Sequence, residues 1–388
     1  MKIGITCYPT YGGSGVVATE LGKALALRGH EVHFISYAIP TRLTAFVDNI
    51  FYHEVEMYSY PLFEFPLYSL ALTSKMVEVA KINELDLIHA HYAIPHAASA
   101  YLAREILKRE NNTEKELKVI TTLHGTDITL IGLEPSFLPT MKFSIEQSDG
   151  VTAVSNFLAD KTKTSYQVQK DIEVIPNFID TEKYKRMDNE HTKCFREKFA
   201  PDGERILTHI SNFRQLKRVQ DVIKVFAEVN KDVPSRLLLI GDGPDRSECE
   251  RLARELEIFD LVKFMGKQDM LVELLSISDL FIMPSQSESF GLSALEAMSC
   301  SVPIISTSIG GLPELNVHGE TGYIAEIGDV ERIDKYAIEL LTNKKKYEYF
   351  SKKARERALK FREENIVPLY EDFYEKIVAE NKKEQVIE

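Results

Sequence analysis

Short apolar runs alternate with longer amphipathic stretches along the whole chain. In the first half, the runs predict parallel strands at 3–7, 31–36, 87–92, 118–123, 150–155 and 172–175, and the alternation of apolar and polar residues at 50–55 predicts one more. In the second half, they recur at 206–211, 237–240, 262–266, 279–283 and 302–305. Stretches with helical spacing, such as 16–28 and 70–82, lie between the runs. This repeated alternation predicts an α/β protein built from two doubly wound parallel sheets.

Composition narrows the class of protein. The chain has 388 residues, enough for two domains, and a net charge of −12 that disfavours nonspecific nucleic-acid binding. Its four cysteines are scattered without a CxxC pair, which predicts free thiols in a reducing compartment and gives no metal-site spacing. Met1 and Lys2 run straight into the first strand, and no apolar run is long enough to span a membrane. We therefore expect a cytoplasmic protein.

The stretch PSQSESFGLSALEAM at 284–298 carries the strongest chemical signal. It follows a buried strand, turns at Gly291 and continues as a helix. Glu288 in the loop and Glu296 in the helix fall outside the apolar face of that helix, so both can face the crevice beyond the strand ends. Backbone amides at 290–292 suit an anion, whereas carboxylates suit hydroxyl groups. Sugar hydroxyls beside a diphosphate indicate a nucleotide-sugar. The alternative is two solvated charges.

Two other loops follow strands. Gly12–Gly15 reads GGSG and precedes a helix, an arrangement that binds phosphate or carboxylate, although a tight turn is the alternative. The loop NFRQLKR at 212–218 places three cations at the end of a strand. Fixed cations there would stabilise the negative charge that grows on a departing diphosphate. The alternative for this loop is a solvated basic turn.

Further polar side chains stand at strand ends in the first half. The strand at 118–123 is followed by His124-Gly125-Thr126-Asp127. A histidine at a strand end is usually structural, but the glycine and aspartate beside it favour a role in a site. Tyr92, Thr122 and Asn156 occupy similar positions and offer hydroxyl or amide groups to a small polar ligand.

Taken together, these motifs resemble the retaining glycosyltransferases of the GT-B fold, family GT4. Glu288 and Glu296 with Ser289-Phe290-Gly291-Leu292 between them are similar to the family's EX7E motif, and PNFID at 176–180 is similar to its crossover between domains. The resemblance covers essentially the whole chain. It implies two Rossmann-like domains facing a central cleft, at 1–175 with a returning C-terminal helix at 364–388, and at 176–363.

The resemblance also implies roles for individual residues. His124, Lys217 and Glu288 would be catalytic, with Glu288 on the transferred sugar, Glu296 on the ribose and the backbone near Met265 reading the base. No metal or other cofactor is expected, because Lys217 and helix N-termini can carry the phosphate charge. The implied donor-binding residues are Gly13, Gly15, Asn212, Lys217, Arg218, Met265, Glu288, Ser289, Phe290, Gly291, Leu292 and Glu296.

Within the family, CYPTYGGSG, HAHYAIPHA, TTLHGTDIT and SNFRQLKRVQDVI resemble members of the bacillithiol pathway that join N-acetylglucosamine to L-malate. This resemblance implies UDP-N-acetylglucosamine as the donor and L-malate, or a similar small hydroxy acid, as the acceptor. Ser14, Tyr92, Thr122 and Asn156 are the expected acceptor-binding residues. We expect no nucleic-acid or membrane partner, and the sequence leaves a homo-oligomer open.

Other classes of protein share parts of this pattern. A dehydrogenase would need GxGxxG with an acidic residue about 20 positions on, a set that neither half supplies. A non-catalytic two-lobed solute-binding protein would need an export signal. A sugar phosphorylase on the same fold would reveal itself by pyridoxal phosphate absorbance, and a family member with another sugar or lipid acceptor stays an alternative.

Overall fold

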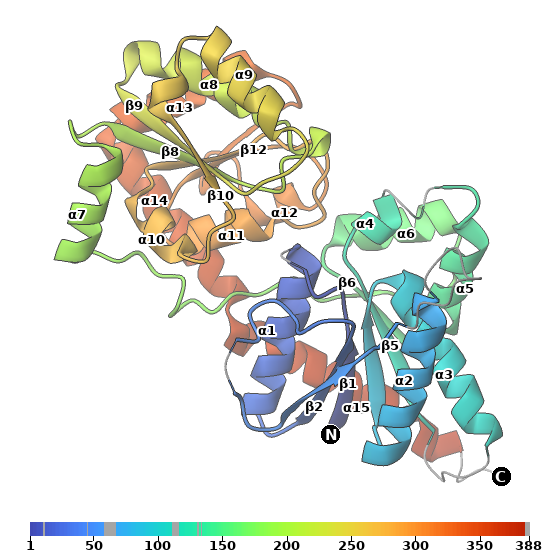
Figure 1. Ribbon diagram of the computed structural model, residues 1–388. Coiled ribbons are helices and arrows are strands. Elements are labelled where there is room, and N and C mark those ends of the chain that lie inside the picture. Colours follow the sequence, from blue (N-terminus) through green and yellow to red (C-terminus); the bar gives the residue numbers. More distant parts are fainter. Residues whose placement is uncertain are drawn as a thin grey trace. The chain divides into compact units, whose positions relative to one another are not determined.

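The computed structural model describes residues 1–10, 12–44, 46–57, 67–110, 116–129, 132 and 134–384. The chain divides into two compact units (Figure 1). Unit 1 comprises Met1–Phe178 and Glu364–Glu388, and unit 2 comprises Ile179–Glu363. The sequence placed the division between 175 and 176. Positions 385–388 of the expected C-terminal segment lie outside the described residues.

Unit 1 is built on a seven-stranded parallel sheet with the order β3-β2-β1-β4-β5-β6-β7. Its central strands are buried on both faces, which explains why they are continuous apolar runs. The strand order reverses between β1 and β4, and open α/β sheets bind ligands at such a point. The strands are β1 (Lys2–Thr6), β2 (Glu31–Ser36), β3 (Ile50–Glu54), β4 (Leu87–His91), β5 (Lys118–Leu123), β6 (Gly150–Ala153) and β7 (Glu173–Val174).

Helices cover both faces of this sheet. On one face, α1 (Gly13–Leu27) and α15 (Glu363–Glu384) share a core with β1, β2 and β4. On the other, α2 (Tyr68–Asn83) and α3 (Ala98–Arg109) form a second core. The C-terminal helix thus packs on the N-terminal sheet. There the Tyr374 hydroxyl forms a hydrogen bond of 2.7 Å with His89 Nδ1. The remaining helical segments are η1 (Ala93–Ala97), α4 (Thr126–Thr129), α5 (Leu138–Gln147) and α6 (Asn156–Tyr166).

Unit 2 repeats the plan with a six-stranded parallel sheet of order β10-β9-β8-β11-β12-β13. Its order reverses between β8 and β11. The strands are β8 (Arg205–Ile210), β9 (Ser235–Ile240), β10 (Val262–Gly266), β11 (Leu280–Met283), β12 (Ile304–Thr307) and β13 (Gly322–Ala325). The sequence did not predict β13.

Two layers of helices flank this sheet in Figure 1, with α8, α9 and α13 on one face and α10, α11 and α14 on the other. Apolar side chains of α8 and α13 share one large core with the strands. The helical segments are α7 (Glu190–Phe199), η3 (Gln215–Lys217), α8 (Val219–Asp232), α9 (Arg246–Glu255), η4 (Phe259–Leu261), α10 (Leu271–Ile277), α11 (Leu292–Ser299), α12 (Leu312–Leu315), α13 (Val330–Thr342), α14 (Lys344–Ala358) and η5 (Leu359–Phe361).

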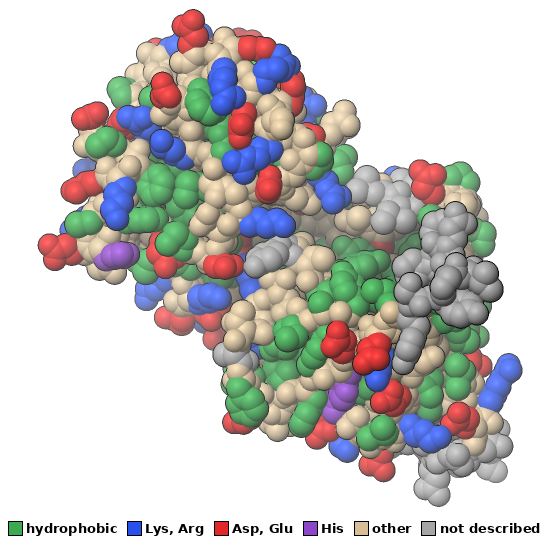
Figure 2. Space-filling view, in the orientation of Figure 1, with side chains coloured by type: hydrophobic (Ala, Val, Ile, Leu, Met, Phe, Trp, Pro, Cys, Tyr) green, Lys and Arg blue, Asp and Glu red, His purple; other side chains and the backbone are tan. Residues whose placement is uncertain are grey.

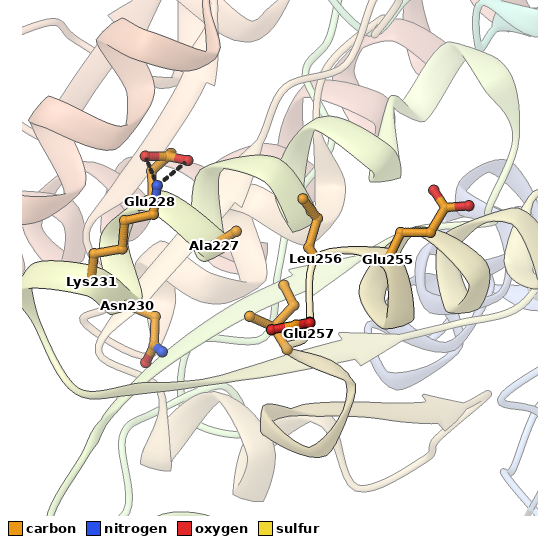
Figure 3. Close-up of a pocket in the computed structure, with 8 residues that line it drawn as sticks. Ala227, Glu228, Asn230, Lys231, Glu255, Leu256 and Glu257 are labelled. Atoms are coloured by element: carbon orange, nitrogen blue, oxygen red, sulfur yellow. Dashed lines mark hydrogen bonds and ion pairs between the residues drawn. The ribbon is translucent and has the colours of Figure 1, made fainter.

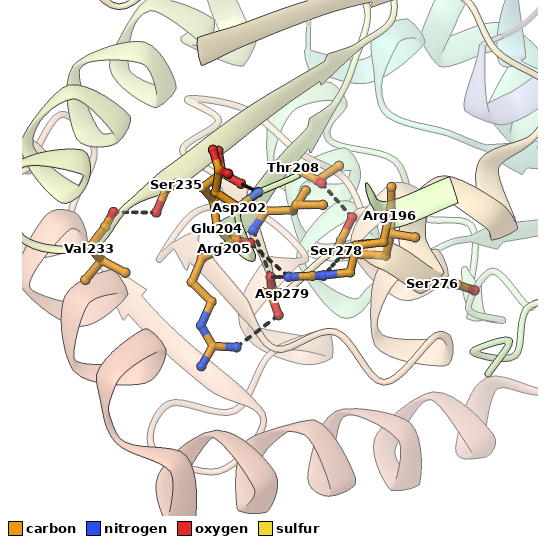
Figure 4. A network of polar contacts seen from close by, with 12 residues as sticks. Arg196, Asp202, Glu204, Arg205, Thr208, Val233, Ser235, Ser276, Ser278 and Asp279 are labelled. Atoms are coloured by element: carbon orange, nitrogen blue, oxygen red, sulfur yellow. Dashed lines mark hydrogen bonds and ion pairs between the residues drawn. The ribbon is translucent and has the colours of Figure 1, made fainter. Parts of the chain in front are cut away.

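Asp279 ties the amino ends of β8 and β11 together (Figure 4). Its carboxylate is 5% exposed and accepts from Arg196 at 2.6 Å, Arg205 at 3.2 Å and the amide of Ile206 at 2.8 Å. A buried carboxylate is tolerated only when such partners replace water. This network fixes the edge of the sheet opposite the strand ends that carry the motifs.

Acidic and basic side chains are interspersed on the face of unit 2 seen in Figure 2, as suits a chain with a net charge of −12. Among the described residues, no helix is long and apolar enough to cross a membrane. Cys7, Cys249 and Cys300 are buried free thiols, and Cys194 is an exposed one.

Candidate functional site

Lys217 and Glu288 meet at the point where the strand order of unit 2 reverses. Lys217 ends η3, in the loop after β8, and Glu288 lies in the loop after β11. Lysine Nζ stands 2.5 Å from Glu288 Oε1, and both side chains are largely buried, at 20% and 14% exposure. The sequence implied a role for each residue, but it gave no sign that they pair.

Other contacts lock these two loops to each other. The amide of Gln286 donates to the carbonyl of Leu216 at 2.7 Å, and the Ser285 hydroxyl donates to Glu288 Oε1 at 3.3 Å. Thr307, at the end of β12, donates to the Ser285 carbonyl at 2.6 Å. The carboxylate and the ammonium group are therefore held in place by backbone as well as by side chains, which favours a preorganised polar site.

The α11 N-terminus presents the rest of the motif. Gly291 caps this helix at a φ of 96°, a left-handed conformation that glycine adopts without strain. Phe290 is buried, with its ring edge-on to Phe361 at 5.6 Å, while Ser289 and Leu292 are half-buried. Phe290 is therefore a packing residue, and only its backbone is placed to meet a ligand at the helix N-terminus.

Glu296, the second glutamate of the motif, is buried. The sequence placed it outside the apolar face of its helix, yet it is only 4% exposed and sits among buried residues of α11. Its charge is close enough to Cys300 to add to burial in raising the pKa of that thiol. Because α11 is enclosed almost all round, a position outside its apolar face is no guide to exposure.

Three other expected donor contacts lie around the same edge. Asn212 is exposed after β8. Arg218 has a φ of 50° and its Nε donates to Asp221 at 2.6 Å, so this guanidinium is anchored at the start of α8. The Met265 carbonyl, on the edge strand β10, accepts from the Gln268 side chain at 2.6 Å.

In unit 1, the glycine loop and the end of β4 come together. Ser14, in the first turn of α1, donates its hydroxyl to the Tyr92 hydroxyl at 2.9 Å. Gly13 is exposed at the start of that helix. Gly15 is buried, and a Cβ there would lie 2.4 Å from the Tyr8 carbonyl oxygen, so only glycine lets the loop close this tightly. Tyr92 has a φ of 100°, a strained conformation of the kind that clusters at functional sites.

His124 lies beside this group at the end of β5. Its Nε2 is 2.8 Å from His91 Nδ1, and the two rings stack with centroids 5.0 Å apart. Burial lowers the pKa of His124 to about 3 and that of His91 well below its usual value, so both rings are neutral at pH 7. Asp127 organises the loop by accepting from the amides of His124, Gly125 and Ala93.

Thr122 is not placed to bind the acceptor, contrary to what the sequence suggested. Its side chain is fully buried, and its hydroxyl lies 2.6 Å from both His89 Nε2 and Thr152 Oγ1. Because β5 is a central strand covered on both faces, Thr122 points into the core, and the structure removes it from the acceptor contacts. Asn156, by contrast, is exposed at the start of α6. The sequence did not single out His91, whose position within a strand gives no such signal.

The residues described above form no metal site, and they do not line the hollow shown in Figure 3. Among the described side chains, no three or more His, Cys, Asp or Glu gather as metal ligands do. The hollow measures about 520 Å³ and is lined by the end of α8 and the residues after α9, including the Glu228–Lys231 pair. It lies at the opposite end of α8 from Lys217.

Comparison with known proteins agrees with this architecture. Residues 11–183 match the family "Glycosyltransferase Family 4", and residues 191–357 match "Glycosyl transferases group 1". The chain belongs to glycosyltransferase family 4, as the resemblance implied. It is 48% identical over 387 residues, 100% of both chains, to the N-acetyl-alpha-D-glucosaminyl L-malate synthase of Bacillus anthracis.

Solved structures share the fold. A glycosyltransferase from Rickettsia africae superposes with a TM-score of 0.80 at 21% identity, covering 97% of this chain and 98% of that one. HepE of Anabaena, solved with UDP and glucose, gives a TM-score of 0.77 at 20% identity, covering 97% and 99%. The expectation of a GT-B glycosyltransferase is confirmed.

Proposed function

We propose that this glycosyltransferase moves N-acetylglucosamine from UDP-N-acetylglucosamine to the hydroxyl group of L-malate, with retention of the anomeric configuration. The product is N-acetylglucosaminyl-malate, the first intermediate of bacillithiol biosynthesis. One observation carries the proposal: the chain matches a protein of that name at 48% identity over the whole of both chains.

The donor would lie at the reversal point of unit 2. Lys217, Arg218 and the amides at the α11 N-terminus would face the diphosphate, and Glu296 would accept from the ribose hydroxyls. As the bond between the sugar and the phosphate breaks, its electron pair goes to UDP, and the lysine ammonium stabilises that charge more in the transition state than in the ground state. No metal ion is needed for this neutralisation in our proposal.

Glu288 and His124 would hold the transferred sugar. Glu288 already faces Lys217 at 2.5 Å, so binding of the donor would let each partner exchange part of that ion pair for a ligand group of suitable charge. The carboxylate is an acceptor for sugar hydroxyls, and the neutral His124 ring can form a hydrogen bond without adding charge.

The acceptor would bind at the glycine loop of unit 1. Backbone amides at the N-terminus of α1 suit a malate carboxylate, and the Ser14 and Tyr92 hydroxyls, 2.9 Å apart, can bind a second carboxylate or orient the attacking alcohol. Burial raises the pKa of Tyr92 to about 12, so its hydroxyl keeps its proton and remains a donor at pH 7.

An acceptor panel tests the proposal. The purified chain is given UDP-N-acetylglucosamine with L-malate, with a simple sugar, with a diacylglycerol lipid or without acceptor, and UDP release is followed. We expect release with L-malate far above the other three reactions, and we expect EDTA to leave the rate unchanged. Release driven by the sugar or the lipid but not by malate would leave only the family assignment standing.

A further inference from the structure

The hydrogen bond between His91 and His124 fixes where the second ring carries its proton. His91 Nδ1 and His124 Nε2 are 2.8 Å apart, and because both imidazoles are neutral, a single hydrogen lies between these two nitrogens. Two arrangements satisfy this contact. Either His91 donates from Nδ1, or His124 donates from Nε2, and the choice determines the other nitrogen of each ring.

The remaining nitrogen of His91 decides between them. His91 is fully buried, and its Nε2 has no hydrogen-bond partner among the described residues. If His124 donated, His91 would have to carry its hydrogen on this Nε2 and bury an orphaned N–H, which proteins rarely do. If His91 donates, Nε2 keeps only an unused lone pair.

The neighbouring histidines do not provide a hydrogen-bond partner for His91 Nε2. His96 uses its Nδ1 on the His91 carbonyl at 2.7 Å, so it donates there and leaves its Nε2 as an acceptor for the Tyr68 hydroxyl at 3.4 Å. His89 is engaged at both nitrogens, by Thr122 at 2.6 Å and by Tyr374 at 2.7 Å. The nitrogens of His89 and His96 are therefore already paired and do not serve His91 Nε2.

The hydrogen bond from His91 determines which nitrogen of His124 carries a hydrogen. With Nε2 accepting from His91, its hydrogen must sit on Nδ1. Within the part of the chain that the structure describes, Nδ1 has no protein partner, and His124 is half-buried rather than enclosed, so this edge is open to a ligand.

We propose that His91 is a positioning residue that holds His124 as the Nδ1–H tautomer, so that His124 presents a hydrogen-bond donor to the bound sugar and has no lone pair free to act as a general base. The identity of the ligand rests on the proposed function, but the tautomer does not. His124 would then act by binding a sugar oxygen and not by accepting the proton of the attacking hydroxyl.

Nitrogen-15 NMR of the imidazole side chains tests the tautomer directly, with no substrate present. We expect the His124 signals, assigned by their loss in His124→Gln, to show a protonated Nδ1 and an unprotonated Nε2 between pH 6 and pH 8. A protonated Nε2 on His124 would overturn the proposal, whether or not the chain glycosylates malate.

Two substitutions of His91 test the effect on the reaction. His91→Asn keeps an N–H near the position of Nδ1, whereas His91→Leu fills similar space without a donor. We expect His91→Leu to mix the His124 tautomers and to lower kcat by about tenfold or more, the worth of one hydrogen bond. His91→Asn should restore both the wild-type tautomer and most of kcat.

Thermal unfolding of both variants shows whether a loss of kcat comes only from a loss of the folded structure. If His91→Leu does not fold, the tautomer in wild type and in His91→Asn still decides the question. Equal kcat in folded His91→Leu and wild type, or a His124 tautomer unchanged in His91→Leu, would show that His91 only fills space.

Discussion

At the scale of single residues, Lys217 and Glu288 are bound to each other across two loops of unit 2. If Lys217 stabilises the departing UDP, Lys217→Ala should raise the barrier by about 2–4 kcal/mol, which lowers kcat by a factor of roughly 30 to 1000. Donor binding should change much less, because the charge on UDP grows only as the bond breaks.

Steady-state kinetics with varied donor measures this effect. Lys231→Ala is the matched control, since Lys231 is an exposed lysine of the same unit paired with Glu228. An unchanged kcat with only a raised KM in Lys217→Ala would assign Lys217 to donor binding instead of to the transition state.

Substitutions of Ser14 and Thr122 distinguish a residue that contacts the acceptor from one that stabilises the core. Ser14 is half-buried and pairs with Tyr92 at 2.9 Å, whereas the Thr122 hydroxyl is sealed in the core between His89 and Thr152. We expect Ser14→Ala to raise the KM for malate and spare stability. Thr122→Ala should lower the free energy of unfolding by about 1–3 kcal/mol and spare that KM.

Urea unfolding and malate kinetics on both variants provide the measurement. UDP binding, followed by calorimetry, is the shared control and should be unchanged in each. The reverse pattern, with malate KM rising in Thr122→Ala alone, would return Thr122 to the acceptor site.

The sequence identifies the loops that carry these residues but not their partners. Glu288 and Lys217 are 71 positions apart, and no local pattern reports that they meet. Burial is equally hard to read from spacing when an element is enclosed all round, and neither the burial of Glu296 nor the core partners of Thr122 could be read from the sequence. Motifs at strand ends are more readable, because every parallel strand delivers its following loop to one edge of the sheet.

At the scale of elements, the loop that begins α1 offers a matched pair of glycines. A Cβ at Gly15 would lie 2.4 Å from the Tyr8 carbonyl oxygen and 2.7 Å from that of Thr10, whereas a Cβ at Gly13 would meet nothing within 4 Å. Gly15→Ala should therefore displace the loop, lowering stability by about 1–3 kcal/mol and activity with it.

Gly13→Ala is the control and should be at least as stable as the wild type, because the added Cβ meets no atom and alanine favours a helix more than glycine does. Thermal unfolding of the two variants makes the comparison. If Gly15→Ala is as stable and as active as Gly13→Ala, the close approach of Gly15 to Tyr8 and Thr10 is not required.

Secondary structure was predictable where the apolar signal is long. The strands of unit 1 and the first four of unit 2 were all expected near their observed positions, and so was β12. The strand β13 was missed; it lies at the edge of the sheet and forms a strand by pairing with β12. Helix α1 begins at Gly13 and not at the expected 16, since the glycine loop itself forms its first turn.

At the scale of the whole molecule, buried histidines make stability depend on pH. Burial lowers the pKa of His89 and His124 to about 3 and that of His96 and His209 to about 4, and it also lowers the pKa of His91 well below its usual value. Unfolded histidine titrates near 6.5, so between about pH 6.5 and 4 the unfolded chain binds more protons than the folded one. Stability should fall as the pH drops through this window.

Unit 1 should be affected more than unit 2, because His89, His91, His96 and His124 lie in unit 1 and His209 in unit 2. The pKa of Asp127, raised by burial to about 6, works in the opposite direction with a single proton. Hydrogen exchange at pH 7 and pH 5, corrected for intrinsic rates, should show larger losses of protection in β4 and β5 than in β8. Equal protection of β4 at both pH values would contradict this linkage.

The most direct test of the whole account is the product itself. The purified chain is incubated with UDP-N-acetylglucosamine and L-malate, and the new compound is isolated and examined by proton NMR. We predict one equivalent of UDP for each glycoside formed, with the N-acetylglucosaminyl group on the malate hydroxyl and the α configuration of the donor preserved. A β-linked product would contradict retention, and a mixture that yields no N-acetylglucosaminyl-malate would contradict the proposed reaction.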